Sequence, residues 1–356
     1  MNLHWSTVVL GRPGELFDDR YRLQELIGQG GFGEVWKAID TYRSNGPVLE
    51  THTVALKLIT TRDRGATWQE ASILTALKSD HILEVNNADI YVDVPYIDTD
   101  LAATSLDKRA MPLGAEPEQA VGWMRRALRG LELCHQHRLL HRDVKPGNIF
   151  LTHSGSAKLG DFGNVTLMDA DGRAAVGGDH LIWAPEFFKG ASASVASDIY
   201  AAGVTLYAVL AGRMPYTGFK QLADLAEAIV RGAHQPLRDI APHVSMALAD
   251  KVKTAMSLNP ADRYTSAAEF DIALAIHPRS RRFIPTPVHP GHLRCWTAVG
   301  KGADVHVCAI QGPTSRRVSI VTAHADSGRR ITRLCCDVTQ AQAAKRLRAV
   351  FGELRD

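Results

Sequence analysis

The sequence predicts an α+β fold in which a β-rich N-terminal part is followed by a helical part and then by a small C-terminal α+β module. Three patterns indicate this order: β-prone stretches before residue 100, an apolar helical stretch over residues 201–211, and alternating apolar stretches after a proline-rich segment at residues 278–291. With 356 residues, the chain is long enough to bury a large core.

A glycine-rich turn joins the first two predicted strands, residues 21–27 and 34–38. Its motif consists of Gly28, Gly30, Gly33 and Val35. Because glycine has no Cβ atom, the backbone of such a turn can close over phosphate groups. A dinucleotide-binding turn has the same glycine spacing, but it leads into a helix, whereas a strand follows here. The turn therefore favours a hairpin that covers a nucleotide.

A lysine lies within the next predicted strand, residues 54–59. Lys57 is costly to bury at this position without an anionic partner. Glu70, in a helix predicted over residues 68–77, is the natural partner. The alternative is a lysine that reaches solvent from a strand end and a solvated glutamate.

Residues 141–151 form the most specific stretch of the chain, because they place a carboxylate, an ammonium group and an amide on one short loop. Asp143 is expected to orient an incoming hydroxyl and accept its proton, while Lys145 stabilises the γ-phosphate. Asn148 is expected to hold a second Mg²⁺, and Asp161 is expected to bind the bridging Mg²⁺. Together these residues predict ATP-dependent phosphoryl transfer.

The motifs resemble those of a eukaryotic-like Ser/Thr protein kinase domain of the bacterial, soluble type, over residues 20–276. The resemblance implies a bilobal protein kinase fold: a five-stranded antiparallel sheet with one helix to about Asp98, then a helical lobe to about His277. It also implies transfer of the γ-phosphate of ATP, with Mg²⁺ or alternatively Mn²⁺, to Ser or Thr of a protein substrate, including the chain itself. The implied ATP contacts come from Gly28, Gly30, Gly33, Val35, Ala55, Lys57, Asp100 and Ala102, with Thr99 as a small gatekeeper.

Other matched residues have structural or regulatory roles in the family: His141, Arg142, Phe162, Gly163, Asp179, Glu186, Asp198 and Arg263. The resemblance implies a buried ion pair between Glu186 and Arg263. It also implies that Asp198 braces the backbone of the catalytic loop, and that His141 and Phe162 stack between the two lobes.

Asp179 departs from the family pattern, because a Thr is usual at its position. A carboxylate there can pair with Lys145, but it also brings like charge close to Asp143. Peptide specificity is therefore left open by the sequence. A pseudokinase-like scaffold that binds ATP and recruits partners is the alternative function, and small-molecule phosphotransfer is a further one that Lys145 and Glu186 disfavour.

Arg142 suggests a second departure. An Arg beside the catalytic Asp usually pairs with an activation-loop phosphate, yet Thr166 is the one hydroxyl residue between Gly163 and Ala184. We hypothesise that Asp169 or Asp171 supplies a permanent counter-charge for Arg142, so that the domain is active without a phosphate on this loop. The alternative is that Asp169 belongs to an ordinary solvated turn.

The C-terminal region follows a predicted proline-rich linker. The predicted boundaries are an extension at 1–19, a kinase domain at 20–277, the linker at 278–291 and a basic module at 292–356. Strands are predicted at residues 293–299, 305–310, 317–322 and 330–336, and a helix at residues 339–354 with Ala343, Leu347, Val350 and Phe351 inward.

Charge is distributed unevenly along the chain, whose net charge is +3. The part of the chain from Arg279 onward contains fourteen Lys or Arg and five Asp or Glu, so its net charge is +9 and that of the remainder is −6. Module 292–356 is therefore a candidate docking surface for a protein or for nucleic acid, or a stabilising appendage. Its four cysteines lack Cys-x-x-Cys spacing, which favours buried thiols over a metal site. The sequence predicts a cytoplasmic protein without membrane insertion.

Overall fold

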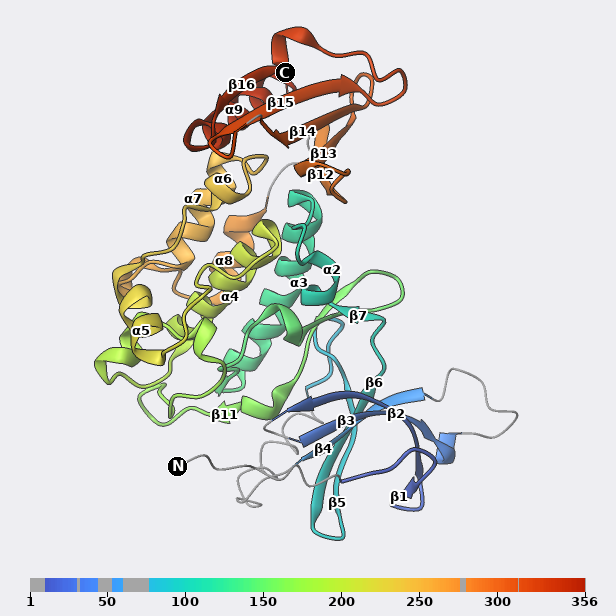
Figure 1. Ribbon diagram of the computed structural model, residues 1–356. Coiled ribbons are helices and arrows are strands. Elements are labelled where there is room, and N and C mark those ends of the chain that lie inside the picture. The colour runs from blue at the N-terminus through green and yellow to red at the C-terminus, as the bar shows by residue number, and fades with distance from the viewer. Residues whose placement is uncertain are drawn as a thin grey trace.

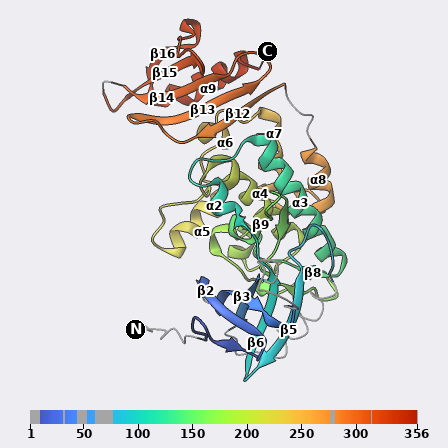
Figure 2. The ribbon, with the colours of Figure 1, turned by 90° about the vertical axis from the view of Figure 1, so that its right-hand side faces the viewer.

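The protein consists of three bodies arranged in a row (Figure 1). The computed structural model describes residues 10–30, 33–43, 53–59, 77–275, 280–312 and 314–355. A sheet of N-terminal strands lies at one end, a helical lobe occupies the middle, and the C-terminal module lies at the other end. A view from the side shows the same order (Figure 2). Within the described ranges, no helix is both long and apolar enough to cross a membrane.

The N-terminal lobe is an antiparallel sheet with the strand order β1-β2-β3-β4-β6-β5. Its strands are β1 (Leu16–Phe17), β2 (Tyr21–Gly30), β3 (Gly33–Asp40), β4 (Thr53–Ile59), β5 (Val85–Tyr91) and β6 (Val94–Asp100), with a short 3₁₀ turn, η1 (Thr41–Arg43), after β3. The predicted count of five strands is wrong by one. The extra strand is β1, a two-residue strand from the predicted extension 1–19 that pairs with the start of β2.

Alternation of side chains sets the two faces of this sheet. In β3 and β4 every second residue is buried, which is the period expected of a strand with one face in a core. Trp36 and Leu56 belong to the buried face. Val35 and Lys57 alternate with them and are direct neighbours across the β3–β4 pair. The register therefore places Lys57 on the face away from this core.

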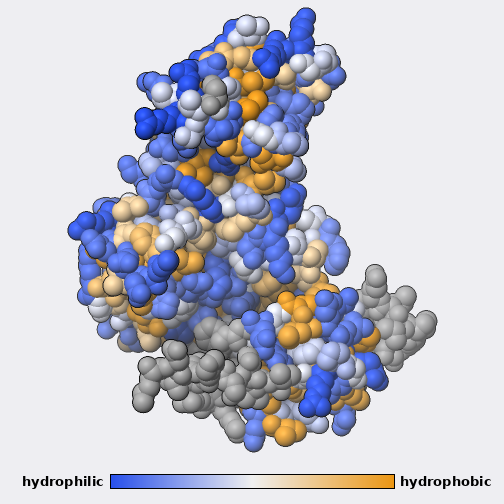
Figure 3. All heavy atoms as spheres, in the orientation of Figure 1, coloured by the Kyte–Doolittle hydropathy of each residue, from blue (hydrophilic) through white to orange (hydrophobic). Residues whose placement is uncertain are grey.

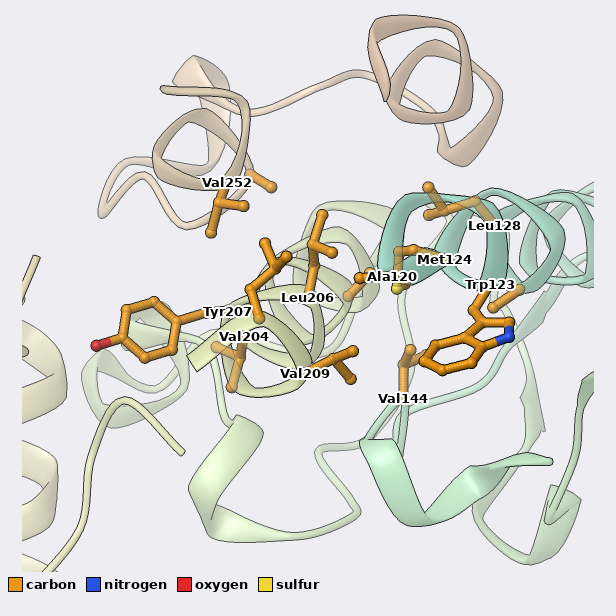
Figure 4. Close-up of a cluster of buried hydrophobic side chains, with 14 of the residues drawn as sticks. Ala120, Trp123, Met124, Leu128, Val144, Val204, Leu206, Tyr207, Val209 and Val252 are labelled. Carbon is orange, nitrogen blue, oxygen red and sulfur yellow. The ribbon is translucent and has the colours of Figure 1, made fainter. Parts of the chain in front are cut away.

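The helical lobe is built around two long helices, α3 and α4. Its helices are α2 (Leu106–Ala110), α3 (Pro117–Gln136), α4 (Val195–Ala211), α5 (Leu222–Arg231), α6 (Leu237–Ile240), α7 (Met246–Ala255) and α8 (Ala267–Leu274). Every residue of α4 from Ser197 to Ala211 is buried, as predicted for a core helix. Figure 4 shows Ala120 and Met124 of α3 on the side toward Leu206 of α4, and these residues belong to the large core of the lobe.

Short strands and 3₁₀ turns lie within the connections between the helices. The strands are β7 (Thr104–Ser105), β8 (Leu139–Leu140), β9 (Ile149–Leu151), β10 (Ala157–Leu159) and β11 (Thr166–Leu167), and the turns are η3 (Pro146–Asn148), η4 (Phe162–Asn164), η5 (His180–Ile182), η6 (Pro185–Lys189) and η7 (Pro260–Asp262). Strands β8 and β9 flank the loop that contains Asp143. The turn η4 begins directly after Asp161.

The C-terminal module is a five-stranded antiparallel sheet with one helix. Its elements are β12 (Arg281–Thr286), β13 (His292–Gly300), β14 (Val305–Gln311), β15 (Arg317–His324), η8 (Thr332–Leu334), β16 (Cys336–Thr339) and α9 (Gln340–Glu353). The strands pair in chain order. Leu347, Val350 and Phe351 of α9 are buried and Ala343 is partly buried, as predicted.

Two predictions for this module are wrong. The predicted linker 278–291 contains β12, which pairs with β13 along six residues. Proline is tolerated there because β12 is an edge strand, where one backbone donor is dispensable. The strand predicted at residues 330–336 is instead the turn η8, and β16 begins at Cys336. Leu334 of this turn is fully buried, so its apolar residues serve the core without pairing as a strand.

Arginines join the module to the helical lobe. Arg294 of β13 donates hydrogen bonds to the carbonyl oxygens of Ile240 and Leu113. Arg348 of α9 forms an ion pair with Asp239 at 2.6 Å. Some of the excess arginines of the module therefore bind groups of the helical lobe. Hydrophilic side chains still cover much of the face shown in Figure 3.

His243 of the lobe lies at the same junction and is almost fully buried. Its ring packs against Trp296 and Phe351 of the module. Burial, together with the nearby charges of Arg294 and Arg355, lowers the pKa of His243 to about 3. The imidazole is therefore neutral in the folded protein at neutral pH.

We expect this histidine to make the folded state less stable in mild acid. Below its ordinary pKa of about 6.5 the unfolded chain binds a proton that the folded chain does not accept, so stability falls as pH drops from 6.5 toward 3. The loss between pH 6.5 and pH 5 is on the order of 2 kcal/mol. Urea unfolding at both pH values measures it, and His243→Phe should show a smaller decrease. Equal decreases in both proteins would contradict the assignment to His243.

Candidate active site

A cleft of about 510 Å³ lies between the N-terminal sheet and the helical lobe. Six of the predicted ATP-binding residues line it: Gly28, Val35, Ala55, Lys57, Asp100 and Ala102. Gly30 ends β2, and Gly33 opens β3 with a φ of 125°, where an added Cβ would lie 1.9 Å from the Leu58 carbonyl oxygen. Gly33 is thus required by the backbone of the hairpin.

Apolar side chains form the two walls of the cleft. Ile27, Val35 and Ile97 come from the sheet, Leu83 precedes β5, and Phe150 comes from β9 of the helical lobe. Such a slot suits a flat aromatic base. Sequence reasoning did not single out Ile27 or Phe150. The available signal was strand alternation, because Phe150 lies between the buried residues of β9.

Lys57 forms an ion pair with Asp161 across the cleft. Burial disfavours the charged carboxylate of Asp161, but Lys57 outweighs this effect and lowers its pKa. Asp161 has a φ of 53°, and its carboxylate accepts a hydrogen bond from the Gly163 backbone. An added Cβ at Gly163 would lie 2.7 Å from the Lys57 amine. Glu70, the predicted partner of Lys57, lies outside the described residues.

The Asp143 carboxylate is held by four donors. Its Oδ2 accepts from Asn148 Nδ2 at 3.0 Å and from Asn164 Nδ2 at 3.2 Å, and it lies 3.1 Å from Lys145 Nζ. Its Oδ1 accepts from the Asp179 backbone N at 3.0 Å. These contacts fix the direction of a carboxylate that is 2% exposed. Asn164 was not predicted from the sequence, and its position directly after Gly163 was the available signal.

Lys145 lies between two carboxylates, as the sequence allowed. Its Nζ is 3.1 Å from Asp143 and 3.7 Å from Asp179. Burial disfavours the ammonium charge, but Asp143 outweighs this and raises the pKa of Lys145. The other Asp179 oxygen accepts from the Leu181 backbone and begins the turn η5. Asp179 thus caps a turn and also contributes charge beside Lys145.

Asp198 braces the start of the catalytic loop. Its two oxygens accept hydrogen bonds from the backbone N atoms of His141 and Arg142, at 2.9 and 2.8 Å. Burial disfavours its charge, but a contact with His135 outweighs this and lowers the pKa of Asp198. His141 is fully buried, which lowers the pKa of its imidazole, and its ring lies 5.4 Å from that of Phe162.

The surroundings of Arg142 bear on the hypothesis of a permanent counter-charge. Its guanidinium donates to the carbonyl oxygens of Asn164 and Ala175. The Asp169 carboxylate accepts hydrogen bonds from the backbone N atoms of Asp171 and Arg173. Asp169 therefore closes a turn, and the counter-charge that the hypothesis assigns to Asp169 or Asp171 stays a prediction.

Gly178 packs the segment after that turn onto the catalytic loop. It has a φ of 79°, and an added Cβ would lie 2.0 Å from the Arg142 carbonyl oxygen. This close approach delivers the Asp179 backbone N to Asp143. The local sequence around Gly178 does not indicate this role, because the need for glycine arises from a contact between distant segments.

Glu186 and Arg263 form a buried, bidentate ion pair. Arg263 Nη1 and Nη2 donate to the two Glu186 oxygens at 2.8 and 2.7 Å. The Arg263 side chain is 0% exposed, and it also donates to the carbonyl oxygens of Ala196 and Ser257. The pair ties η6 to the loop before α8, so it holds the segment that follows Asp179.

The amide oxygen of Asn148 and the carboxylate of Asp161 are groups that suit a hard divalent cation. Asn148 uses its Nδ2 for both bonds to Asp143, and among the described residues no donor contacts its Oδ1. The Asp161 carboxylate lies in the cleft lining. Carboxylate and amide oxygens are ligands that Mg²⁺ accepts together with substrate phosphates. The donor set therefore fits a metal that is bound jointly with a nucleotide.

The sequence matches the protein kinase domain family over residues 21–273. It is 34% identical over 272 residues to serine/threonine-protein kinase PknD of Mycobacterium tuberculosis. This alignment covers 72% of the present chain and 39% of PknD. It is 32% identical to serine/threonine-protein kinase PknE of the same organism, in an alignment that covers 72% of the present chain and 45% of PknE. It is 29% identical over 315 residues to serine/threonine-protein kinase PknA of that organism, in an alignment that covers 84% of the present chain and 70% of PknA.

The chain therefore belongs to the protein kinase domain family. Its resemblance to bacterial Ser/Thr protein kinases and its bilobal α+β fold are confirmed. The family uses ATP and divalent metal ions in general. The chain spans less than half the length of the PknD and PknE relatives that it matches.

Proposed function

We propose that the protein transfers the γ-phosphate of ATP to Ser or Thr hydroxyls of a protein substrate, including its own. The observation that carries this proposal is the arrangement around Asp143. Its carboxylate is fixed by four donors and lies 3.1 Å from the Lys145 ammonium. A hydroxyl that approaches this point meets a base for its proton and a cation for the incoming phosphoryl group.

The positions of the other residues support the following roles. The adenine would lie between the apolar walls, with the hinge backbone of Asp100 and Ala102 beside it. Lys57 would leave Asp161 to contact the phosphates. Asn148 and Asp161 would hold Mg²⁺, or Mn²⁺ in its place, and the metal would neutralise charge on the phosphates.

Phosphate incorporation from labelled ATP with Mg²⁺, followed by site mapping with mass spectrometry, tests the proposal. Incorporation on Ser or Thr by the wild-type chain, lost in Lys57→Met and in Asp161→Ala, is the expected result. ATP binding without incorporation, on the chain or on generic acceptors, would overturn it and favour the pseudokinase-like scaffold. Mapped sites would also show whether Thr166, the hydroxyl nearest Asp161 in its segment, is modified.

We also propose that module 292–356 recruits a protein partner or nucleic acid. Exposed arginines outside the contacts with the helical lobe support this: Arg316, Arg317, Arg329 and Arg330. Arg316 and Arg317 lie at the start of β15, and Arg329 and Arg330 lie in the segment that follows its end. Charge reversal at these four positions should weaken binding to an acidic protein or to nucleic acid in a salt-dependent way.

A further inference from the structure

Two imidazoles and two thiols meet in the C-terminal module, far along the chain from the cleft. They belong to His289, His292, Cys295 and Cys308, and their ligand atoms all lie within 4.8 Å of one another. His289 precedes β13, His292 and Cys295 lie on β13, and Cys308 lies on β14. Three parts of the chain thus supply one cluster.

The distances match a tetrahedral metal site. The His292 Nδ1 atom is 3.3 Å from the Cys295 sulfur, and His289 Nδ1 is 3.6 Å from the same sulfur and 3.9 Å from the Cys308 sulfur. Zinc–sulfur bonds of about 2.3 Å and zinc–nitrogen bonds of about 2.0–2.1 Å, at a tetrahedral angle, separate sulfur from nitrogen by about 3.6 Å. The three separations therefore lie within about 0.3 Å of the value that a tetrahedral zinc site requires.

Strand geometry explains how the cluster forms. Cys295 and Cys308 are direct cross-strand partners, so their side chains share one face of the sheet. His292 and Cys295 are three residues apart and would point to opposite faces of a regular strand. A register shift in β13 between His292 and Arg294 inserts one extra residue and returns both side chains to the same face.

The burial of the two thiols supports a built site. Trp296 and Val307, the neighbours of Cys295 and Cys308, face the core under α9. The cysteines consequently lie on the other face of the sheet, yet both are buried. His289 and His292 contact them there, from the connection between β12 and β13 and from the start of β13. The connection between β12 and β13 thus brings His289 into contact with two sulfur atoms that lie outside the main core.

We propose that these four residues bind one structural Zn²⁺ ion. A closed set of two thiolates and two imidazoles in tetrahedral geometry is the ligand set that zinc favours. Binding would release the thiol protons and would fix the β12–β13 connection to β13 and β14. Arg294, next to Cys295, enters the helical lobe, so the ion would also stabilise the docking of the module.

Metal analysis of the purified, tag-free full chain tests the proposal. We expect about one zinc per chain in the wild type, measured by inductively coupled plasma mass spectrometry. The double variant Cys295→Ser/Cys308→Ser should lose the zinc. The matched double variant Cys335→Ser/Cys336→Ser removes two thiols from the same module and should keep it.

A second variant covers the case in which the buried cysteine variant does not fold. His289 is exposed, so His289→Gln should fold and should bind zinc more weakly in a chelator competition. His306→Gln, a change of a nearby histidine whose Nδ1 contacts Thr297, is its control and should not change the affinity. Cobalt substituted into the metal-free wild type should show the absorption bands of a tetrahedral thiolate site.

Three results would overturn the proposal. One is a folded wild-type chain that contains no zinc and takes up neither zinc nor cobalt. Another is zinc that remains in both the Cys295→Ser/Cys308→Ser and the His289→Gln variants. The third is a Cys295–Cys308 disulfide in protein prepared under reducing conditions, seen as a mass loss of two hydrogens. None of these results depends on phosphoryl transfer, so the two proposals fail separately.

Discussion

Asp143→Asn is expected to lower kcat for phosphoryl transfer by about 10²–10⁴-fold, the usual contribution of a general base. The amide has no negative charge to accept the hydroxyl proton. Its NH₂ group would also face donors that now converge on the carboxylate, among them Asn148 and Asn164. Because other residues line the cleft, KM for ATP should change much less than kcat. Steady-state kinetics with varied ATP measure both constants.

Asp179→Asn is the matched control for this prediction. It removes a negative charge that is likewise close to Lys145, at 3.7 Å, while keeping the backbone N–H that binds Asp143. The Asp179 side chain is 36% exposed, so the change should affect folding stability by less than about 1 kcal/mol and should keep most of the activity. Equal losses in the two variants would contradict a special role for Asp143.

Arg263→Met is expected to lower the free energy of unfolding by about 3–5 kcal/mol, because it leaves the Glu186 carboxylate without its partner. It also removes the donors to the carbonyl oxygens of Ala196 and Ser257. Glu186→Gln in the same chain should restore part of the loss, since the remaining group is then neutral. Urea unfolding of the single and double variants measures both effects.

An exposed ion pair of the same lobe provides the comparison. Arg231 and Glu227 lie one turn apart on α5, 2.9 Å from each other, with side chains that are 73% and 61% exposed. Glu227→Gln should therefore change stability by only ~0.5 kcal/mol. A similar effect at Arg263 would contradict the view that burial makes the Glu186–Arg263 pair important.

Local sequence patterns were sufficient to predict much of the cleft. Strand alternation places Lys57, and one short loop carries the residues from His141 to Asn148. Both features are set by residues that lie close together in the sequence, and phosphoryl transfer explains why these residue types are present. The structure brings Asp143, Lys145 and Asn148 together as the loop spacing indicated. Glu70 stays a prediction, since it lies outside the described residues.

Features that depend on contacts between distant segments were missed. Gly178 must be glycine because of the Arg142 backbone, which is remote in sequence. β12 was mistaken for a linker because the edge position that tolerates its proline is a property of the whole sheet. The His289–Cys308 cluster is not evident from Cys-x-x-Cys spacing, because its two-residue spacings join His289 to His292 and His292 to Cys295, and because Cys308 joins them only through strand pairing.

The N-terminal sheet and the C-terminal module lie at opposite ends of the helical lobe (Figures 1 and 2), and the cleft lies at the end of the lobe that meets the sheet. A protein bound to the module is not thereby placed next to Asp143. The acceptor hydroxyl of such a protein would reach the cleft only if the segment between its docking site and the hydroxyl is long enough to span the lobe. A shorter segment cannot join the two sites, so binding to the module would not raise the local concentration of the acceptor. Substrates recruited in this way would be selected by the number of residues between the docking segment and the acceptor. A short peptide that contains only the acceptor sequence would gain nothing from the module.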